Sequence, residues 1–356
     1  MSLIFLFGVI SIIIAHNCVT AAVLYPFGDT ESVNLYEESR IGLCITGQIG
    51  RLELESKMEH IIKPLSKTGL VTVDVVLVLG NNSRSEYLHG VKDANQAVYT
   101  TELRIAEFLK PYTGHIRVVF LEQTADPVMN PKYRDNIGWM EAQNTPDRQK
   151  ARTRSHIRQW INLRKCYSTF TDLEVENKAK YDAFIRTRDD GYFISNINPF
   201  PVIVSQSHDA SQHIGKKQPD IIVGACDDWG GYNDKGAVVG RHAASAYFNG
   251  FLDAFYFHYD ELFAHGGTIP LSNYTFGKLG KAKMELNPEQ FTAAVLRYNK
   301  LNVITSSMQF PLIPTKVSKS TSFGKCFRIY RTEKRSMPCY CKEIPHLAQL
   351  ISSGVC

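Results

Sequence analysis

Two short polar clusters contain most of the side chains in this sequence that could do chemistry. The first, residues 186–191 (RTRDDG), comes directly after an apolar stretch. Paired carboxylates such as Asp189 and Asp190 can hold a divalent cation through oxygen ligands, and the cation can neutralise a diphosphate. The flanking guanidinium groups of Arg186 and Arg188 can add bidentate contacts to phosphate. The alternative is a turn in which these arginines and aspartates pair with one another and hold no ligand.

The second cluster, residues 227–235 (DDWGGYNDK), contains three carboxylates, two aromatic rings and a Gly-Gly pair. Glycines let the backbone approach a ligand, aromatic faces stack on sugar rings, and a carboxylate can act as a base toward an acceptor hydroxyl. The alternative is a plain polar turn, but such a turn seldom contains Trp and Tyr beside three acids. A functional site is therefore favoured here.

Alternating strands and helices are expected to position the two clusters. Five apolar runs are predicted to be strands, and they lie at residues 41–47, 73–79, 115–121, 181–186 and 220–225. Three helices are predicted between them, at residues 52–65, 101–109 and 155–170, with Pro64 and Gly69 ending the first. Continuous apolar strands of this kind indicate an α/β fold with a mostly parallel sheet covered on both faces. Ligands bind such sheets beyond the carboxyl ends of the strands, which is where both clusters fall.

Two further segments are distinctive. Residues 122–154 are polar and include three prolines, which predicts a long surface loop that could fold over a site. Residues 243–263 are rich in aromatic side chains, which is typical of a helix packed into the core. A sugar-stacking platform is the alternative for this second segment.

The bulk composition is that of an ordinary globular protein, with 44% hydrophobic and 21% charged residues. The net charge of +5 is spread along the chain without a long Lys/Arg block, so we interpret it as a solvated surface and expect no nucleic-acid partner. Residues 3–15 are apolar and uncharged, and small residues follow at positions 20–22. This pattern predicts a signal peptide or an uncleaved anchor over residues 1–22.

The eight cysteines also point to the secretory pathway. Cys18 lies in the predicted leader, and four cysteines lie near the C-terminus: Cys326, Cys339, Cys341 and Cys356. Two local disulfides are expected among these four, with zinc as the alternative. Three others are predicted to be buried thiols with one possible pair among them: Cys44, Cys166 and Cys226. The glycosylation sequons at Asn81 and Asn273 fit luminal exposure.

Three short motifs give the sequence a family resemblance. Residues 46–51 (TGQIGR) follow the first strand, residues 181–190 (YDAFIRTRDD) form a strand and its turn, and residues 231–235 (GYNDK) come later. Over roughly residues 40 to 265 the sequence resembles GT-A-type glycosyltransferases, which have a G-Q/H-x-R loop, a Y-D-x-x-I/V strand with an R-x-R-x-D turn, and an N-D loop at these places. In that family the acidic turn is often Asp-x-Asp, whereas this chain has Arg188-Asp189-Asp190.

The resemblance implies a Rossmann-like domain, which we expect over residues 40–314, whereas the Cys-rich C-terminal extension expected over residues 315–356 has no counterpart in the family. It implies a hexosyltransferase in the ER or Golgi lumen, or secreted, that uses a nucleotide-sugar donor and a glycan or glycoprotein acceptor, and that has manganese or magnesium as cofactor. Membrane contact would come only from the leader. The donor or its phosphates are expected to contact Thr46, Gly47, Gln48, Arg51, Arg186 and Arg188. The acceptor is expected near Trp229, Gly231, Tyr232 and Asn233. Asp234 and Asp228 are the candidate catalytic residues, and Asp189 and Asp190 the candidate metal ligands.

Two other functions remain open from the sequence. A noncatalytic, secreted carbohydrate-binding protein could keep the same fold. A glycoside hydrolase would need two carboxylates on opposite sides of a cleft, and the arginines beside the acidic turn suit phosphate better than a neutral sugar.

Overall fold

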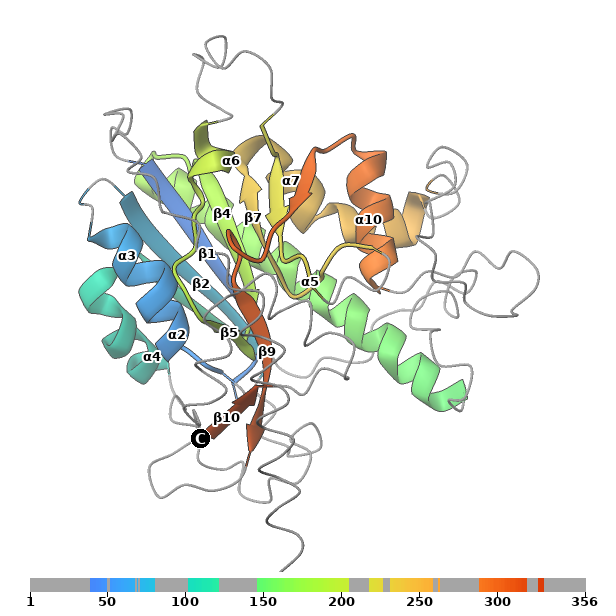
Figure 1. Cartoon of the computed structure of the whole chain (residues 1–356), viewed down its shortest axis with the longest axis horizontal. Coiled ribbons are helices and arrows are strands. Elements are labelled where there is room, and N and C mark those ends of the chain that lie inside the picture. Colours follow the sequence, from blue (N-terminus) through green and yellow to red (C-terminus); the bar gives the residue numbers. More distant parts are fainter. Residues whose placement is uncertain are drawn as a thin grey trace, which may run out of the picture.

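The chain folds around a seven-stranded sheet with helices on both faces (Figure 1). This computed structural model describes residues 39–49, 52–67, 69, 71–80, 102–121, 146–204, 218–226, 231–258, 262, 288–318 and 326–329. The strand order is β3-β2-β1-β4-β7-β6-β8. The predicted fold class, a mostly parallel Rossmann-like α/β sheet flanked by helices, is confirmed.

The directions of the strands bring two parts of the chain to one edge of the sheet. The strands are β1 (Ser39–Gln48), β2 (Val71–Gly80), β3 (Ile116–Leu121), β4 (Ala183–Arg188), β6 (Ile221–Val223), β7 (Gly236–Gly240) and β8 (Val303–Thr305). All neighbours pair in parallel except β7, which is antiparallel to both β4 and β6. The start of β7 therefore lies beside the end of β4, with Gly236 paired to Thr187.

The helices form two groups, one on each face of the sheet. The first group contains α2 (Glu55–Lys57), a π-helical turn η2 (Met58–Ile62), α3 (Lys63–Ser66), α4 (Glu102–Leu109), the 3-10 turn η4 (Lys110–Tyr112) and α6 (Phe200–Val204). The second contains α5 (Pro146–Asn177), α7 (Arg241–Phe248), α8 (Gly250–Asp253), a π-helical turn η6 (Ala254–His258) and α10 (Pro288–Tyr298). A separate three-stranded sheet, β10-β9-β5, is formed by β5 (Gly191–Phe193), β9 (Leu312–Ser318) and β10 (Cys326–Ile329).

Alternate residues of the central strands point into two hydrophobic clusters, one under each group of helices. In β1, Leu43 and Ile45 pack with residues of η2, α3 and α4, whereas Cys44 packs with residues of α5, α7 and α8. This alternation is the two-residue period of a strand buried on both faces. The predicted parallel sheet with two covered faces is thus observed.

Two expectations about helix ends were wrong. Pro64 does not end the first helix, because the π-helical turn before it continues into α3 and places the proline in the first turn of that helix, where no backbone N–H is needed. The predicted loop at residues 122–154 is helical from Pro146 onward. Proline fits the first position of a helix, and residues 147–177 contain neither glycine nor proline.

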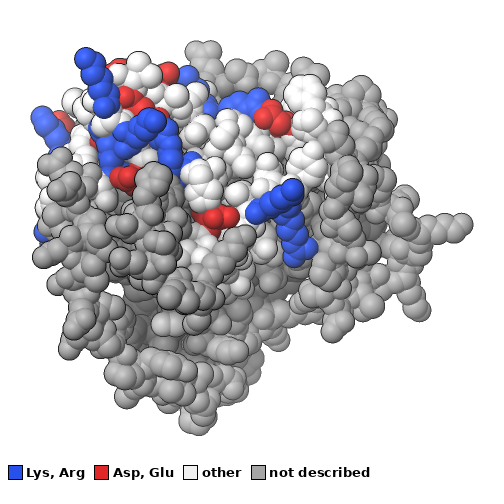
Figure 2. All heavy atoms as spheres, turned by 90° about the horizontal axis from the view of Figure 1, so that it is seen from above, with Lys and Arg blue, Asp and Glu red and all other residues white. Residues whose placement is uncertain are grey.

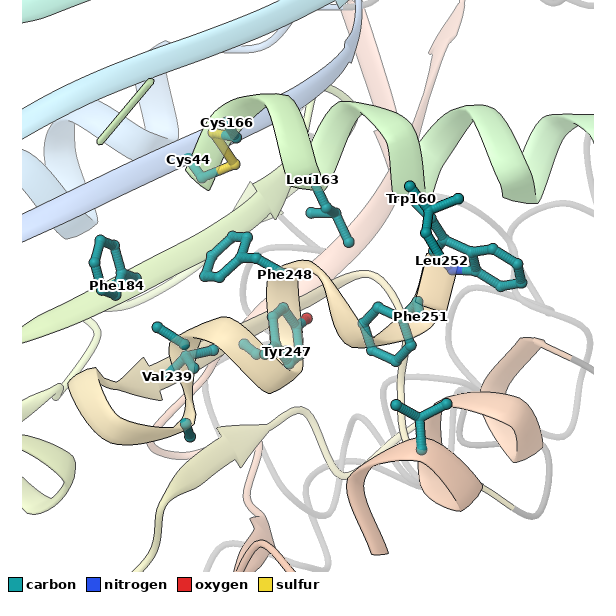
Figure 3. Packing of buried hydrophobic residues seen from close by; sticks show 14 of the residues in the cluster. Cys44, Trp160, Leu163, Cys166, Phe184, Val239, Tyr247, Phe248, Phe251 and Leu252 are labelled. Carbon is teal, nitrogen blue, oxygen red and sulfur yellow. A yellow bond between two sulfur atoms is a disulfide. The ribbon is translucent and has the colours of Figure 1, made fainter. Parts of the chain in front are cut away.

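A disulfide joins Cys44 of β1 to Cys166 of α5 inside the hydrophobic cluster under the second group of helices (Figure 3). The one possible pair expected among the three internal cysteines is therefore confirmed. Cys226 is disulfide-bonded as well, so the expectation of buried free thiols was wrong. Two cysteine thiols that lie close together form a disulfide in an oxidising compartment. The sequence around each cysteine does not show which cysteines lie close together in the fold.

The aromatic segment forms the core beneath α5, as the core-packing interpretation predicted. Phe248 stacks on Tyr167 with ring centroids 5.4 Å apart. The rings of Trp160 and Phe251 have centroids 6.2 Å apart (Figure 3). Phe248, Phe251 and Phe255 are buried, whereas Phe257 is an exception and is 74% exposed. The described aromatic residues therefore contribute mainly packing area rather than a sugar platform.

A polar cluster lies at the opposite edge of the sheet, near the amino ends of β1, β2 and β4. The fully buried Asp74 carboxylate accepts hydrogen bonds from Arg40 Nε at 2.7 Å, the Tyr181 hydroxyl at 2.7 Å and the His115 amide at 2.5 Å. Burial and the hydrogen bond to Asp74 raise the pKa of Tyr181, so its hydroxyl remains a donor. The cluster ties β1 and β2 to the segments that lead into β3 and β4.

Basic and acidic side chains lie beside one another on the face shown in Figure 2. This mixture agrees with the interpretation of the net charge as a solvated surface.

Within the described ranges, no helix combines the length and the apolar character needed to cross a membrane. The predicted leader, both sequons and three of the tail cysteines (Cys339, Cys341 and Cys356) lie outside the described residues. The domain boundary predicted at residue 315 stays a prediction; β9 runs across that position.

Candidate functional site

The candidate site is formed where β1 and β4 end and β7 begins. Thr46 of β1 is paired with Arg188 of β4, and Thr187 of β4 is paired with Gly236 of β7. The parallel register of β1 and β4 brings two of the three sequence motifs together, and the antiparallel β7 adds the third. The sequence predicted this convergence from the rule for α/β sheets.

Asp189 holds the end of β1 in place. Its side chain is fully buried, its carboxylate accepts a 2.8 Å hydrogen bond from the Gln48 amide, and its own amide donates to the Thr46 carbonyl at 2.9 Å. Gly47 faces this carboxylate with a φ of +148°, and a Cβ there would lie 2.1 Å from the Asp189 Cγ. The Asp189 carboxylate therefore contacts the first motif directly.

We expect Gly47→Ala to destabilise the fold by about 2–3 kcal/mol, because the added methyl group would overlap the Asp189 carboxylate and the backbone would be strained. Equilibrium urea unfolding measures this difference. Gly80→Ala is the control: a Cβ at this neighbouring strand end meets only ordinary contacts, the nearest at 3.6 Å. Equal stabilities for the two variants would contradict the steric account.

Asp190 pairs with Arg188 through both of its oxygens. Arg188 Nε lies 3.0 Å from Oδ1, and Arg188 Nη2 lies 2.9 Å from Oδ2. The attraction of Asp190 raises the pKa of Arg188 despite the opposing effect of burial. The two side chains are 27% and 15% exposed, so the pair lies at the surface end of the site. The internally paired turn considered as an alternative is thus present for these two residues.

Arg186 is completely buried and only partly hydrogen-bonded. Its Nη1 donates to the backbone carbonyl of Asp234. Its Nε and Nη2, which form one edge of the guanidinium, make no hydrogen bond within the part of the chain that the structure describes. Burial lowers the pKa of this guanidinium and outweighs the attraction of Tyr247 and Asp234. Unsatisfied buried donors are costly, so this edge favours an acceptor with two oxygens.

The carboxylate of Asp234 lies near the charges of Arg186 and Arg188. Burial alone would raise its pKa, but the positive charges of Lys235, Arg188 and Arg186 outweigh burial, and the net direction is downward. Lys235 Nζ is 4.0 Å from its Oδ1. Gln159 of α5 donates to its backbone carbonyl at 3.4 Å. The carboxylate is therefore ionised and suited to accept a hydrogen bond.

Three other predicted site residues brace the loop before β7. The Asn233 amide donates to the Cys226 carbonyl at 2.5 Å, and its oxygen accepts from the Lys235 amide at 2.9 Å. Gly231 lies against α10, where a Cβ would be 2.0 Å from the Glu289 carbonyl oxygen. The Tyr232 amide donates to the same carbonyl at 3.0 Å. These contacts fix the loop, and acceptor contact by these residues stays a prediction.

The remaining predicted residues, Arg51, Asp228 and Trp229, lie outside the described residues. Within the described ranges, no group of three His, Cys, Asp or Glu side chains could hold a metal ion. Asp189 and Asp190 fit such an ion poorly, because one carboxylate already accepts the Gln48 amide and the other is paired with Arg188. Their assignment as metal ligands stays a prediction.

Two residues near the site were not predicted. Tyr247 of α7 lies close enough to Arg186 for their electrostatic interaction to affect both pKa values, while burial raises the pKa of its own hydroxyl. The sequence placed Tyr247 in the aromatic segment and so predicted core packing for it, but not its position beside Arg186. Lys57 is buried beneath the turn at Asp190 and contacts its backbone. In the sequence, Lys57 is one lysine of a predicted helix, and nothing there indicates that it is buried.

Comparison with known proteins gives matches among solved structures only. No protein-family model matches the sequence, and no curated protein matches it. Among solved structures, the chain is similar to the apo form of mouse xyloside xylosyltransferase 1, with 7% identity over 75% of this chain and 86% of that chain, and a TM-score of 0.34. At this level of similarity, no property of that enzyme carries over to this chain.

Proposed function

We propose that this protein transfers a sugar from a nucleotide-sugar donor to the hydroxyl group of a glycan or glycoprotein acceptor. The observation that supports this most is the unpaired Nε and Nη2 edge of the buried Arg186 guanidinium, at the carboxyl end of β4. A diphosphate presents pairs of oxygens that match this edge, and ligands of α/β sheets bind at this end of the strands. A neutral sugar alone would not need a buried cation there.

In the proposed reaction, the bond between the anomeric carbon of the sugar and the diphosphate oxygen breaks, and the electron pair leaves with the nucleoside diphosphate. The acceptor oxygen forms the new bond to the anomeric carbon and releases its proton to solvent. Arg186, with the neighbouring charges of Arg188 and Lys235, would stabilise the negative charge that develops on the leaving group. The ionised Asp234 would orient the acceptor hydroxyl by accepting its hydrogen bond, because a carboxylate with a lowered pKa is a weak base.

A thermal-shift panel tests this proposal. The purified protein is heated with nucleoside diphosphates, nucleotide sugars and free sugars, each with manganese or with a chelator. A ligand at a hundred times its dissociation constant stabilises a fold by about 2.7 kcal/mol, so we expect a clear rise in melting temperature with one nucleotide sugar and its nucleoside diphosphate. The binder is then incubated with candidate acceptors, and release of nucleoside diphosphate is measured.

The outcomes separate the candidate functions. Stabilisation by free sugars alone, without any effect of nucleotides, would favour the noncatalytic carbohydrate-binding protein. An unchanged melting temperature throughout would contradict the transferase. Comparing the manganese and chelator samples decides whether a divalent cation takes part.

We also propose that the protein works in the secretory pathway. The Cys44–Cys166 disulfide supports this, because such bonds persist mainly in oxidising compartments. Expression of the full chain in secretory cells, followed by determination of the mature N-terminus, tests the proposal. We expect the protein in the lumen or the medium; recovery only in the cytosol would contradict it.

A further inference from the structure

A buried lysine lies directly beneath the turn that carries Asp190. Lys57 of α2 is completely buried, and its Nζ lies 2.6 Å from the Gly191 carbonyl oxygen and 3.4 Å from the Asp189 carbonyl oxygen. These two carbonyls are on either side of Asp190 in the chain. One ammonium group therefore holds the backbone on both sides of a candidate site residue.

The segment from Glu53 to Lys57 makes further contacts with this part of the chain. The Glu53 amide donates to the Asp189 carbonyl at 3.0 Å, and the Phe193 amide donates to Ser56 Oγ at 3.0 Å. The Glu53 carboxylate accepts from the Ser56 amide at 2.7 Å and from Ser56 Oγ at 2.5 Å, and it lies 3.3 Å from Lys57 Nζ. Residues 53–57 and 189–193 thus form one connected unit, which we call the buried brace.

Stability alone does not explain a buried ion pair at this position. Taking two charges out of water is costly, and apolar residues of similar size often give an equally stable or more stable fold. What Lys57 provides, and an apolar side chain cannot, is a donor for the carbonyls of Asp189 and Gly191. Asp190 in turn holds Arg188 in a bidentate pair. The contacts therefore run from the lysine to the arginine at the surface end of the site.

We propose that Lys57 is a positioning residue, whose ammonium fixes the 189–191 turn so that Asp190 and Arg188 are held in the geometry that the reaction needs. This inference rests on the proposed transferase function. A misplacement of about 1 Å in a catalytic arrangement can cost about a hundredfold in rate. Loss of the brace should therefore reduce kcat, whereas a lysine that only stabilised the fold would leave the kinetics of the folded protein unchanged.

The experiment uses two variants of the full chain and one matched control. Lys57→Met removes the donor but leaves Glu53 buried without its ion-pair partner, and this variant risks not folding. The double variant Glu53→Gln/Lys57→Met removes both charges and so avoids an unpaired buried charge. Lys63→Met is the control, because Lys63 forms the same i,i+4 pair with Glu59 six residues later, with side chains 26% and 57% exposed.

We expect the double variant to fold with a lowered melting temperature, because the buried carbonyls that Lys57 contacts lose this donor, while the kcat of the folded protein falls by about ten- to a hundredfold. Lys63→Met should keep both values. Hydrogen–deuterium exchange at the amides of residues 190–193 should be faster in the double variant than in the control. A double variant with wild-type kcat and wild-type exchange would overturn the proposal.

Failure of the transferase function would be visible separately. If the wild type neither binds nor turns over any nucleotide sugar, the proposed function fails, and the exchange measurement still decides whether Lys57 holds the turn. Unchanged exchange would then overturn the positioning role itself.

Discussion

Arg186→Met is expected to lower the rate of sugar transfer by about a hundredfold or more while leaving the fold intact. Removing one well-placed donor from an oxyanion site typically costs about 10²- to 10³-fold in rate, and the Nε and Nη2 edge would present two donors. The free energy of unfolding should stay close to that of the wild type or rise, because methionine removes a buried charge that is only partly hydrogen-bonded. The Asp234 carbonyl that loses the Nη1 donor still has the 3.4 Å contact from Gln159.

This prediction separates a functional arginine from a structural one. Initial-rate kinetics with the nucleotide sugar found in the binding panel, together with equilibrium urea unfolding, give both quantities for the same protein. Arg117→Met is the control, since Arg117 forms an exposed pair with Glu176, with side chains 47% and 54% exposed, and such pairs contribute little. A large loss of stability with normal kinetics in the Arg186 variant would show that the guanidinium is only part of the framework.

The double variant Cys44→Ala/Cys166→Ala is expected to lose about 3–5 kcal/mol of unfolding free energy. The disulfide closes a loop whose ends are 122 residues apart in sequence, and crosslinks that close long loops reduce the entropy of the unfolded chain most. Both cysteines are also fully buried in the cluster beneath α5. Equilibrium denaturation of the oxidised wild type and the double variant measures the difference.

The variant is a sharper test than a reducing agent, because Cys226 is disulfide-bonded too and would also be reduced. Wild type treated with a reductant should therefore lose at least as much stability as the double variant. Superimposable denaturation curves for wild type and double variant would show that the β1–α5 crosslink does not contribute to stability.

The sequence was sufficient to predict the sheet and the meeting of the polar motifs at the carboxyl ends of its strands, because both depend on local patterns. Apolar runs such as that of β2 identify buried strands, and the rule for the carboxyl ends of strands then locates the polar clusters. It did not predict β7, which has only five residues and a glycine at each end. Glycine is depleted in strands and common in turns, so this run, which directly follows a polar cluster, gave no strand signal.

The separate roles of the two neighbouring aspartates could not be predicted either. Asp189 and Asp190 differ in their contacts, because the carboxylate of Asp189 accepts from the Gln48 amide and that of Asp190 pairs with Arg188. That difference arises from the register of β1 and β4 and from the brace at Lys57, which are long-range features. Residue types and spacing identify candidate site residues. Which of them hold the backbone and which face a ligand depends on packing between distant parts of the chain.

The reversed direction of β7 has a consequence for how proteins with this architecture can diversify. Because the segment between β6 and β7 turns back at the same edge of the sheet, its length and composition can change without a crossing of the sheet. The polar cluster around Asp74 at the far edge would remain untouched by such exchanges. If the proposed transferase function holds, exchange of this one connection would alter acceptor preference, and protein engineers could graft new specificities at the same point.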